Sequence, residues 1–219
     1  MLPRRNEWII IGISGVTCGG KTSLANQLKR SLTPVYVFQQ DKYFYPDDSP
    51  NHIKCEGLDH NNYDILSALD MDGMYRDIQL TMGGQDKSHE SCVTDDGDKF
   101  NINGKKFLIV EGFTVLNYQP IMEMCDFRYY FILEYGECAK RRVHRTYEPP
   151  DVCGYFEQCV WPEHIKYRAL YRSLTHTWNA IVKSDVCGLE LQIPIHYQIR
   201  LTQSRRSEIG MENIIIGSD

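Results

Sequence analysis

The stretch Trp8-Ile-Ile-Ile-Gly-Ile-Ser-Gly-Val-Thr-Cys-Gly-Gly-Lys-Thr22 decides the fold of this 219-residue chain. It opens with a continuous apolar run, the pattern of a strand that is buried on both faces. The eight residues from Gly15 to Thr22 match Gly-x4-Gly-Lys-Thr, the pattern of a phosphate-binding loop. A helix is predicted over 21–32, because three leucines recur there every four residues. The loop therefore has the strand before it and the helix after it that a phosphate-binding loop needs.

This loop predicts nucleotide binding on physical grounds. Its glycines let backbone N–H groups face inward around phosphate oxygens, and the helix N-terminus adds positive potential. Lys21 is expected to reach the β- and γ-phosphates, and the Thr22 hydroxyl to take a Mg²⁺ position. No Gly-x-Gly-x-x-Gly and no Asn-Lys-x-Asp occurs, which disfavours a dinucleotide-binding Rossmann fold and a GTPase. The expected ATP contacts here are Gly15, Val16, Thr17, Cys18, Gly19, Gly20, Lys21, Thr22 and Ser23.

Strand and helix patterns alternate along the rest of the chain, which reads as a single domain over residues 1–219. The polar segment 85–106 is expected to be a surface loop or a small hairpin, with a turn at Asn103-Gly104. The alternation predicts an α/β fold: a P-loop NTPase-type parallel sheet with helices on both faces and a helical lid. Strands are expected over 35–38, 107–110, 128–133 and 178–182, and helices over 64–81, 137–145 and 162–178.

Composition narrows the class of protein. Hydrophobic residues make up 42% and charged residues 24%, and the net charge of -5 disfavours nucleic acid as a partner. Residues 1–6 do not resemble a signal peptide, and no apolar run is long enough to span a bilayer. The eight cysteines include no Cys-x-x-Cys pair and have no histidine at zinc-ligand spacing. Free, mostly buried thiols in the cytosol or the nucleus are therefore expected.

Two acidic residues follow predicted strands at the edge of the sheet where ligands bind. Asp41 comes shortly after strand 35–38, and Glu111 ends strand 107–110. If both strands flank the strand that precedes the loop, both carboxylates face the γ-phosphate. One could accept the proton of an attacking hydroxyl, and either could hold Mg²⁺. Taken alone, Asp41 is better explained as a turn or cap residue and Glu111 as a solvated strand-end acid, but beside a phosphate loop a functional role is favoured for both.

Three arginines lie on the predicted helix 137–145. Arg141 and Arg145 are expected to share a face of that helix, whereas Arg142 points elsewhere. Arginines on a closing lid neutralise the charge that develops during phosphoryl transfer and exclude water. The proline-broken, aromatic-rich stretch that follows favours a hinged lid over about 137–161, although a solvated basic helix face would show the same charges.

These residues together resemble the nicotinamide riboside kinase family, whose relatives include uridine kinase and pantothenate kinase. The resemblance runs from about residue 8 to residue 178, and its Tyr-x-Pro-Pro-Asp and Val-Trp-Pro pieces are more specific than the phosphate loop. The matching segments are Ile11-Gly-Ile-Ser-Gly-Val-Thr17, Gly20-Lys-Thr22, Gln40-Asp41, Phe44, Tyr63-Asp64, Leu108-Ile-Val-Glu-Gly-Phe113, Asn117-Tyr118, Lys140-Arg-Arg142, Arg145-x-Tyr147-x-Pro-Pro-Asp151, Gly154-Tyr-Phe156, Val160-Trp-Pro162 and Lys166-Tyr-Arg168.

The resemblance implies roles for individual residues. Asp41 is expected to be the catalytic base and a Mg²⁺ neighbour, and Asp64 to contact the ribose hydroxyls. Arg141 and Arg145 are expected to contact the ATP phosphates, with Lys21 and Glu111 completing the catalytic group. The implied acceptor site consists of Asp41, Lys42, Tyr43, Phe44, Tyr63, Asp64, Arg142, Tyr147 and Glu148, and the implied Mg²⁺ site of Thr22 and Asp41.

The expected activity is phosphorylation of nicotinamide riboside with ATP and Mg²⁺, giving nicotinamide mononucleotide for NAD synthesis. Aromatic rings and carboxylates suit its flat pyridinium cation. Nicotinic acid riboside is a further candidate acceptor, and a monomer is expected. Two alternatives remain open: a kinase of another nucleoside such as uridine, and a catalytically weak P-loop binding protein.

Two features depart from the family pattern. Lys42 stands where relatives often have a second acid, so it brings a positive charge near a cationic substrate. From about residue 185 the family's ending is not recognisable. Residues 193–201 alternate apolar and polar side chains, which predicts a half-exposed edge strand. A loosened adenine wall would follow from this atypical segment, 186–219, with ATP and GTP serving as donors within about tenfold of each other.

Overall fold

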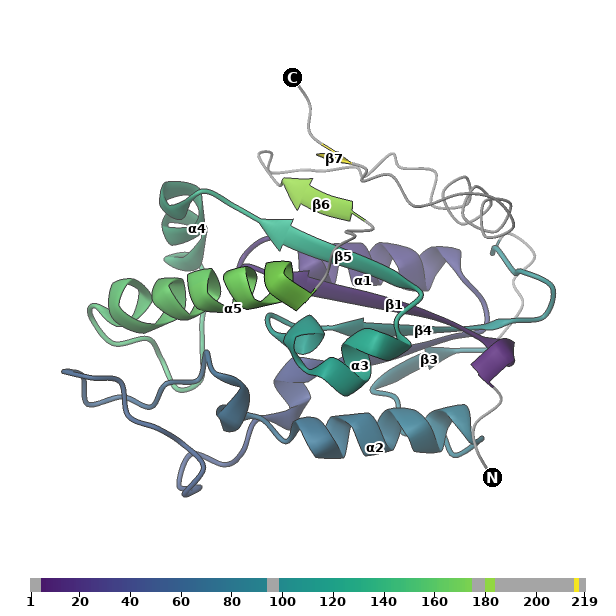
Figure 1. The fold of residues 1–219 in the computed structure, drawn as a ribbon, viewed down its shortest axis with the longest axis horizontal. Coiled ribbons are helices and arrows are strands. Elements are labelled where there is room, and N and C mark those ends of the chain that lie inside the picture. The colour runs from purple at the N-terminus through teal and green to yellow at the C-terminus, as the bar shows by residue number, and fades with distance from the viewer. Residues whose placement is uncertain (1–4, 94–98, 175–179, 184–214, 217–219) are drawn as a thin grey trace.

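The computed structural model describes residues 5–93, 99–174, 180–183 and 215–216. These residues contain a seven-stranded, mostly parallel sheet in the order β3-β2-β4-β1-β5-β6-β7, shown in Figure 1. Its strands are β1 (Trp8–Gly15), β2 (Val35–Gln39), β3 (Glu90–Cys92), β4 (Lys106–Glu111), β5 (Phe127–Ile132), β6 (Ala180–Lys183) and β7 (Ile215–Ile216). The strands expected from the apolar runs are thus confirmed, with shifts of one or two residues at their ends.

The strand order sets which residues meet at the carboxyl edge of the sheet. β1 lies between β4 and β5 and is parallel to both. β2 pairs with the far side of β4 and therefore does not flank β1. The expectation that the strands before both acids flank β1 is wrong for β2. β3 pairs antiparallel with β2, and it comes from the segment that the sequence assigned to a loop or hairpin. Asn103 and Gly104 have positive φ angles of 48° and 72°, which confirms the turn there.

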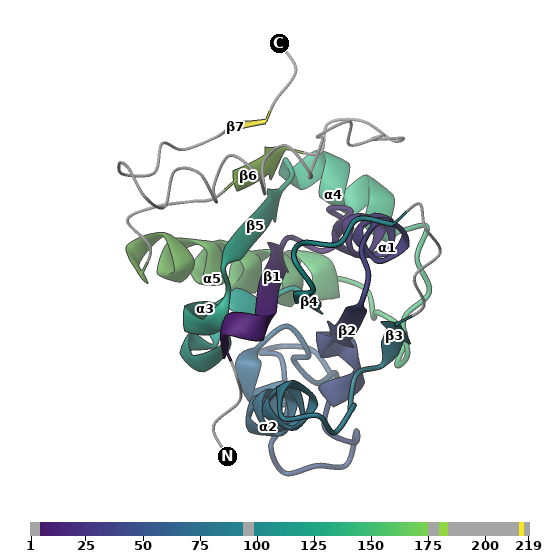
Figure 2. The ribbon, with the colours of Figure 1, turned by 90° about the vertical axis from the view of Figure 1, so that its right-hand side faces the viewer.

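Helices cover both faces of the sheet, as the alternating pattern predicts (Figure 2). They are α1 (Lys21–Ser31), α2 (Met71–Met82), α3 (Gln119–Met124), α4 (Tyr135–Arg142) and α5 (Trp161–Leu174). Shorter helical turns are η1 (Arg5–Glu7), η2 (Gln40–Tyr43), η3 (Leu66–Ala68), η4 (Val115–Asn117) and the π-helical turn η5 (Phe156–Val160).

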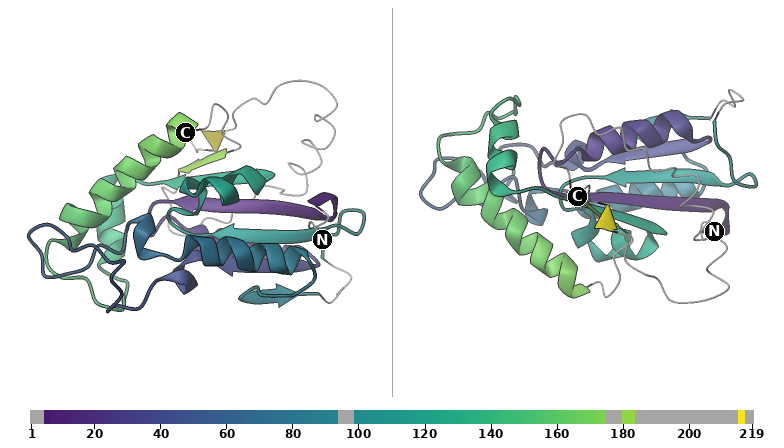
Figure 3. Two further views of the ribbon diagram at one scale, coloured as in Figure 1. Left: turned by 60° about the horizontal axis from the view of Figure 1, so that its bottom comes forward. Right: turned by 90° about the horizontal axis from the view of Figure 1, so that it is seen from above.

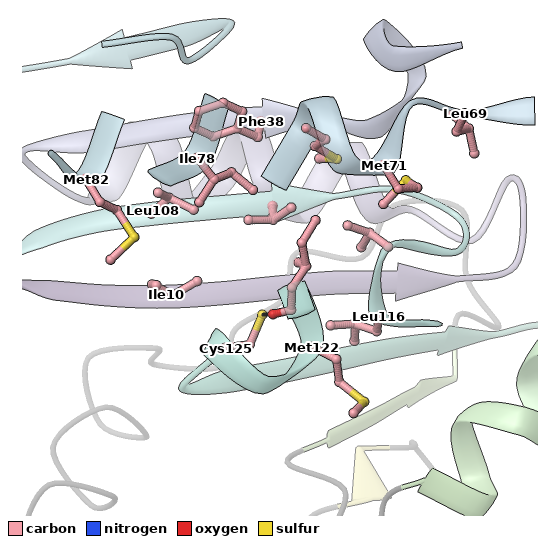
Figure 4. Packing of buried hydrophobic residues seen from close by; sticks show 14 of the residues in the cluster. Ile10, Phe38, Leu69, Met71, Ile78, Met82, Leu108, Leu116, Met122 and Cys125 are labelled. Atoms are coloured by element: carbon pink, nitrogen blue, oxygen red, sulfur yellow. Dashed lines mark hydrogen bonds between the residues drawn. The ribbon is translucent and has the colours of Figure 1, made fainter. Parts of the chain in front are cut away.

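The apolar run of β1 supplies both cores because successive strand residues point to opposite faces. Ile9, Ile11 and Ile13 are buried with the leucines of α1. Ile10 and Trp8 are buried on the other face, with residues of α2, α3 and α5. Figure 4 shows this second cluster, in which methionines of α2 and α3 and Cys125 fill the space beside the strands. A strand buried on both faces is therefore fixed in place by packing from two sides.

The second helix begins later than the sequence predicts. The expectation was 64–81, but α2 starts at Met71, after an extended Ile65 and the turn η3. Asp70 caps the helix, since its side chain accepts a hydrogen bond from the backbone N–H of Gly73 at 2.8 Å. A capping side chain satisfies one of the first N–H groups of a helix and so fixes where it starts. Asp64 consequently lies in a loop, where it can reach the site.

The basic helix also differs from the expectation of 137–145. α4 covers Tyr135–Arg142, and the backbone N–H of Val143 makes the last helical bonds. Arg145 therefore lies beyond the helix, and the prediction that it shares a helix face with Arg141 is wrong. The following helix begins before the expected Pro162, because η5 already turns helically at Phe156 and leads directly into α5.

One cysteine pair contradicts the expectation of free thiols. Cys55, in the loop before Tyr63, and Cys159, in η5, are joined by a disulfide across 104 residues of sequence. The localisation inferred from free thiols stays a prediction. Residues 184–214, which include the expected edge strand 193–201, lie outside the described residues. Within the described residues, no helix is both long and apolar enough to cross a membrane.

Candidate functional site

The carboxyl ends of β1, β2 and β4, the loop after β2 and the chain between α4 and α5 all lie at one end of the sheet. Figure 3 shows these segments together from two directions. The chain brings them there because parallel strands end on the same edge, where ligands of open α/β sheets bind. Most residues that the sequence proposed for the site lie on these segments.

The phosphate loop connects β1 to α1 in a tight turn. Gly15 has a φ of +112°, and a Cβ atom added there would lie 2.2 Å from the carbonyl oxygen of Phe131. The loop is tied back to β5, since the N–H of Val16 donates to that carbonyl oxygen at 3.0 Å. Lys21 lies across the loop with its Nζ donating to the carbonyl oxygen of Val16 at 2.8 Å. Only glycine allows the loop to pass this close to the neighbouring strand.

Charged groups gather next to the loop. The Thr22 hydroxyl lies 3.3 Å from both carboxylate oxygens of Glu111. Burial raises the pKa of Glu111, against the lowering effect of Lys21. Burial in turn lowers the pKa of Lys21, while the charges of Glu111 and Asp41 act to raise it. The charges of both predicted acids thus act on Lys21, although β2 is one strand further from β1 than assumed.

Asp41 is exposed, and the residue before it fixes its backbone. Gln40 is buried at the end of β2, and its Nε2 donates to the Thr114 hydroxyl at 3.0 Å. The N–H of Thr114 donates back to the Gln40 Oε1 at 3.1 Å. A Cβ on Gly112 would lie 2.3 Å from the Gln40 side chain, so this contact also requires a glycine. These bonds hold the strand end that presents Asp41 to solvent beside Lys21.

Asp64, which the sequence assigned to the acceptor site, lies in a polar cluster. Its Oδ2 accepts a hydrogen bond from the Tyr155 hydroxyl at 2.9 Å. The same hydroxyl accepts one from the backbone N–H of Tyr63 at 3.0 Å. Burial raises the pKa of Asp64, although the nearby charge of Arg142 acts to lower it. Tyr155 itself is buried, so it holds the loop residues 63 and 64 against the base of the predicted lid.

Arg142 connects the acceptor side to the phosphate loop. Two of its nitrogens donate to the two carboxylate oxygens of Asp151 at 2.6 and 3.0 Å, and a third donates to the Thr17 hydroxyl at 3.2 Å. Its guanidinium carbon lies 4.1 Å from the centre of the Tyr147 ring. Burial alone would lower the pKa of Arg142, but the bond to Asp151 and the charge of Asp64 raise it. The arginine is therefore charged and held in one geometry.

Tyr147 and Arg145 lie next to the phosphate loop. The Tyr147 hydroxyl lies 3.3 Å from the Thr17 hydroxyl and 3.7 Å from the Cys18 thiol. Arg145 forms a side-chain hydrogen bond with Tyr147, and Asp41 is among the charges that raise its pKa. Arg141 donates to the carbonyl oxygen of Cys18 at 3.4 Å and to Glu137 of its own helix at 2.6 Å. All three predicted arginines thus lie near the phosphate loop.

Two of the aromatic residues predicted for the acceptor site, Phe44 and Tyr63, lie together. The Phe44 ring stacks on Phe113 with centroids 6.0 Å apart and meets Tyr63 edge-on at 5.9 Å. The Tyr63 hydroxyl donates to Asp47 at 3.0 Å. Tyr43 lies apart from this group, because its hydroxyl donates to Asp77 of α2 at 3.1 Å. Its role as an acceptor contact, like that of its neighbour Lys42 and of the exposed Glu148, stays a prediction.

Three residues near the site had no assigned role. Asp151 and Tyr155 belong to the quoted motifs Tyr-x-Pro-Pro-Asp and Gly-Tyr-Phe, so their positions were visible but their partners were not. His164, on α5, lines a small cavity together with Asp64 and Thr17. Nothing in the sequence distinguished it from an ordinary helix residue, since its neighbours in the cavity lie far away along the chain.

The chain is similar to known nucleoside kinases. It is 37% identical over 172 residues to nicotinamide riboside kinase 1 of Homo sapiens, covering 78% of this chain and 81% of that protein. It is 35% identical over 163 residues to human nicotinamide riboside kinase 2, with 73% and 67% covered. A uridine kinase from an Enterobacter species is 29% identical over 155 residues, with 66% and 71% covered.

Solved structures and family models were also compared. A possible uridine kinase from Bacillus stearothermophilus has a TM-score of 0.47 at 17% identity, covering 79% of this chain and 87% of that one. Thymidylate kinase from Candida albicans has a TM-score of 0.43 at 13% identity, covering 95% and 97%. No protein-family model matches the chain.

Proposed function

Because the chain belongs to the nicotinamide riboside kinase family, we propose that it transfers the γ-phosphoryl group of ATP to the ribose 5′-hydroxyl of nicotinamide riboside. The product is nicotinamide mononucleotide, a precursor for NAD synthesis. The observation that carries the proposal is Arg142, whose guanidinium bonds Thr17 of the phosphate loop while its charge acts on Asp64. Arg142 would then contact both the donor and the acceptor side, which supports the close approach of two bound substrates that transfer needs.

On the donor side, backbone N–H groups of the loop and the start of α1 surround the phosphates of ATP. Lys21 exchanges its bond to the Val16 carbonyl oxygen for phosphate oxygens, which compensates the cost of partly burying its charge. Arg141 and Arg145 lie beside the loop and meet the charge that develops on the transferring group. Arg141 is 123 residues from Cys18 in sequence, but the fold brings the two into contact.

Oxygen ligands suited to Mg²⁺ lie beside the loop. The residues that would hold the ion are Thr22 and Glu111, with Asp41 next to them, and Mg²⁺ is typically held by one or two carboxylates together with substrate phosphates. A bound Mg²⁺ would neutralise charge on the phosphate oxygens. Asp41 is the better base, because it is exposed to an incoming hydroxyl, whereas Glu111 is buried and already bonded to Thr22.

On the acceptor side, Asp64 accepts hydrogen bonds from ribose hydroxyls with the oxygen that Tyr155 leaves available. Phe44 and Tyr63 offer ring edges and faces to the flat pyridinium, whose positive charge is favoured by aromatic faces and nearby carboxylates. Tyr147 contributes its ring from the predicted lid, with one face already against Arg142. Electrostatics thus favour an acceptor with a cationic pyridinium ring over one with an uncharged nucleobase.

The test is an ATP-dependent assay over a panel of acceptors: nicotinamide riboside, nicotinic acid riboside, uridine and cytidine, each with and without Mg²⁺. The proposal expects the highest kcat/KM for a pyridine riboside and no turnover without Mg²⁺. A higher kcat/KM for uridine would replace it with the uridine kinase reading, which the more distant similarity supports. Absence of product with every acceptor, in a protein that still binds ATP, would support a binding protein without turnover.

A further inference from the structure

A small cavity lies between the phosphate loop, the acceptor side and α5. It has a volume of about 10 Å³ and is lined by Asp64, Thr17, Phe113 and His164, among others. That volume corresponds to roughly one water-sized group. Three of these four side chains belong to segments already assigned to the site, whereas His164 comes from α5, where its ring packs against Trp161 at 5.3 Å. The cavity therefore adds a polar group that the mechanism above does not use.

The Nε2 atom of His164 is buried and has no hydrogen-bond partner among the described residues. Buried polar atoms in proteins are nearly always hydrogen-bonded, and leaving one unpaired costs free energy. Because His164 lines a cavity next to the predicted acceptor site, a partner for its unpaired ring nitrogen can arrive with the ligand.

The charge state of His164 restricts what that partner can be. Burial, together with the smaller effects of the charges of Arg168 and Lys21, lowers the pKa of His164 to about 4. The imidazole is therefore neutral at neutral pH, so it does not repel a cationic substrate and does not attract a phosphate. A hydroxyl group both donates and accepts, and it can bond Nε2 in either imidazole tautomer. A methyl group of similar size would leave the nitrogen unpaired.

We propose that His164 is a specificity-determining residue, whose Nε2 hydrogen-bonds one ribose hydroxyl of the acceptor while Asp64 binds the neighbouring one. The inference rests on the proposed function, because it needs an acceptor that carries a ribose. The two groups suit neighbouring hydroxyls, because both residues line the same cavity, which has room for one hydroxyl, and Asp64 has an oxygen that Tyr155 does not occupy. Discrimination between ribosides and deoxyribosides follows, because a missing hydroxyl leaves Nε2 unpaired again.

Steady-state kinetics test this with nicotinamide riboside and its 2′-deoxy and 3′-deoxy analogues. His164→Leu removes the nitrogen. His164→Gln and His164→Asn form a matched pair of similar polarity, in which the Gln amide reaches the Nε2 position and the shorter Asn amide does not. We expect His164→Leu and His164→Asn to lower kcat/KM for the riboside about tenfold, the value of one hydrogen bond. For one of the two deoxy analogues the loss should be twofold or less, and His164→Gln should keep most of the activity.

Equal losses on the riboside and both analogues would overturn the proposal, because they indicate a structural role or a water that the ligand does not displace. Unchanged kinetics in both the Leu and the Asn variants would also overturn it. If His164→Leu fails to fold, the comparison of Gln with Asn still decides. If the wild type phosphorylates no pyridine riboside, the proposed function fails separately, and the same comparison is made with the riboside that it does accept and its deoxy analogues.

Discussion

The Tyr155 hydroxyl donates a hydrogen bond to the Asp64 carboxylate at 2.9 Å, although 91 residues of sequence separate the two. The same hydroxyl accepts a bond from the backbone of Tyr63, so one buried side chain of the predicted lid holds two residues of the acceptor loop. We therefore expect Tyr155 to act as a positioning residue, because it touches Asp64, the proposed contact of the ribose hydroxyls.

We predict that Tyr155→Phe raises KM for the riboside about tenfold, because the ring still packs while Asp64 loses its orienting bond. Asp64→Ala should raise KM more strongly, since ribose hydroxyls then lose their acceptor. In the double variant the effects should not add, because both act on the same carboxylate. Additive effects on KM would show that Tyr155 acts independently of Asp64.

Asp41→Asn should lower kcat by about a hundredfold or more and change KM little, because a base acts on the transition state. Glu111→Gln should instead raise the Mg²⁺ concentration that gives half-maximal activity, since Glu111 lies on Thr22 beside the expected ion. Steady-state assays at several Mg²⁺ concentrations separate the two. If Asp41→Asn affected only KM, Glu111 would become the better base.

Lys21→Ala is expected to reduce turnover by at least about a hundredfold, because it removes a charge positioned at the transferring phosphoryl group. Its bond to the Val16 carbonyl oxygen is local, so the variant should remain folded. Circular dichroism supplies that control. Near-normal turnover in the folded variant would contradict phosphoryl transfer at this loop.

Asp64→Asn should stabilise the protein at neutral pH while impairing activity. Burial raises the Asp64 pKa, so between the unfolded and folded values the folded state holds a proton that the unfolded chain has lost. Stability therefore falls as pH rises through that window and stays lower above it. The uncharged Asn side chain does not titrate, so the variant does not lose this stability as pH rises. Its Tm advantage over the wild type should therefore grow from pH 3 to pH 7, two values that lie on either side of the Asp pKa of about 4 in the unfolded chain. The fully exposed Asp59 gives the control variant Asp59→Asn, for which the difference should stay flat.

Gly15→Ala should destabilise the fold by roughly several kcal/mol. Alanine is strained at the positive φ of this residue, and its Cβ would overlap the Phe131 backbone. Gly136→Ala is the matched control, since its Cβ would meet no atom within 4 Å and it lies in α4. Chemical denaturation measures both. Equal stabilities would mean that the turn at Gly15 can relax away from β5.

Much of the fold and part of the site could be predicted from local patterns. The buried strand Trp8–Gly15, the glycine-rich turn and the leucine stripe of α1 are set by residues close together in sequence, so the phosphate loop was identified directly. The arginines of the Lys140-Arg-Arg142 motif were likewise visible, although the end of their helix was not. The start of α2 depends on a single capping bond at Asp70, and the end of α4 at Arg142 has no signal in the local pattern, so the predicted boundaries were wrong there.

The sequence by itself determined the strand, glycine-rich loop and helix near the start of the chain. It also predicted nucleotide binding at that loop and showed the resemblance to riboside kinases. Only the tertiary structure decided which side chains complete the acceptor side, because their partners are distant in the chain. Arg142 bonds Thr17 across 125 residues, and Tyr155 bonds Asp64 across 91. Periodicity and spacing report on neighbours along the chain, whereas such contacts arise only when the strand order brings separate loops to one edge of the sheet.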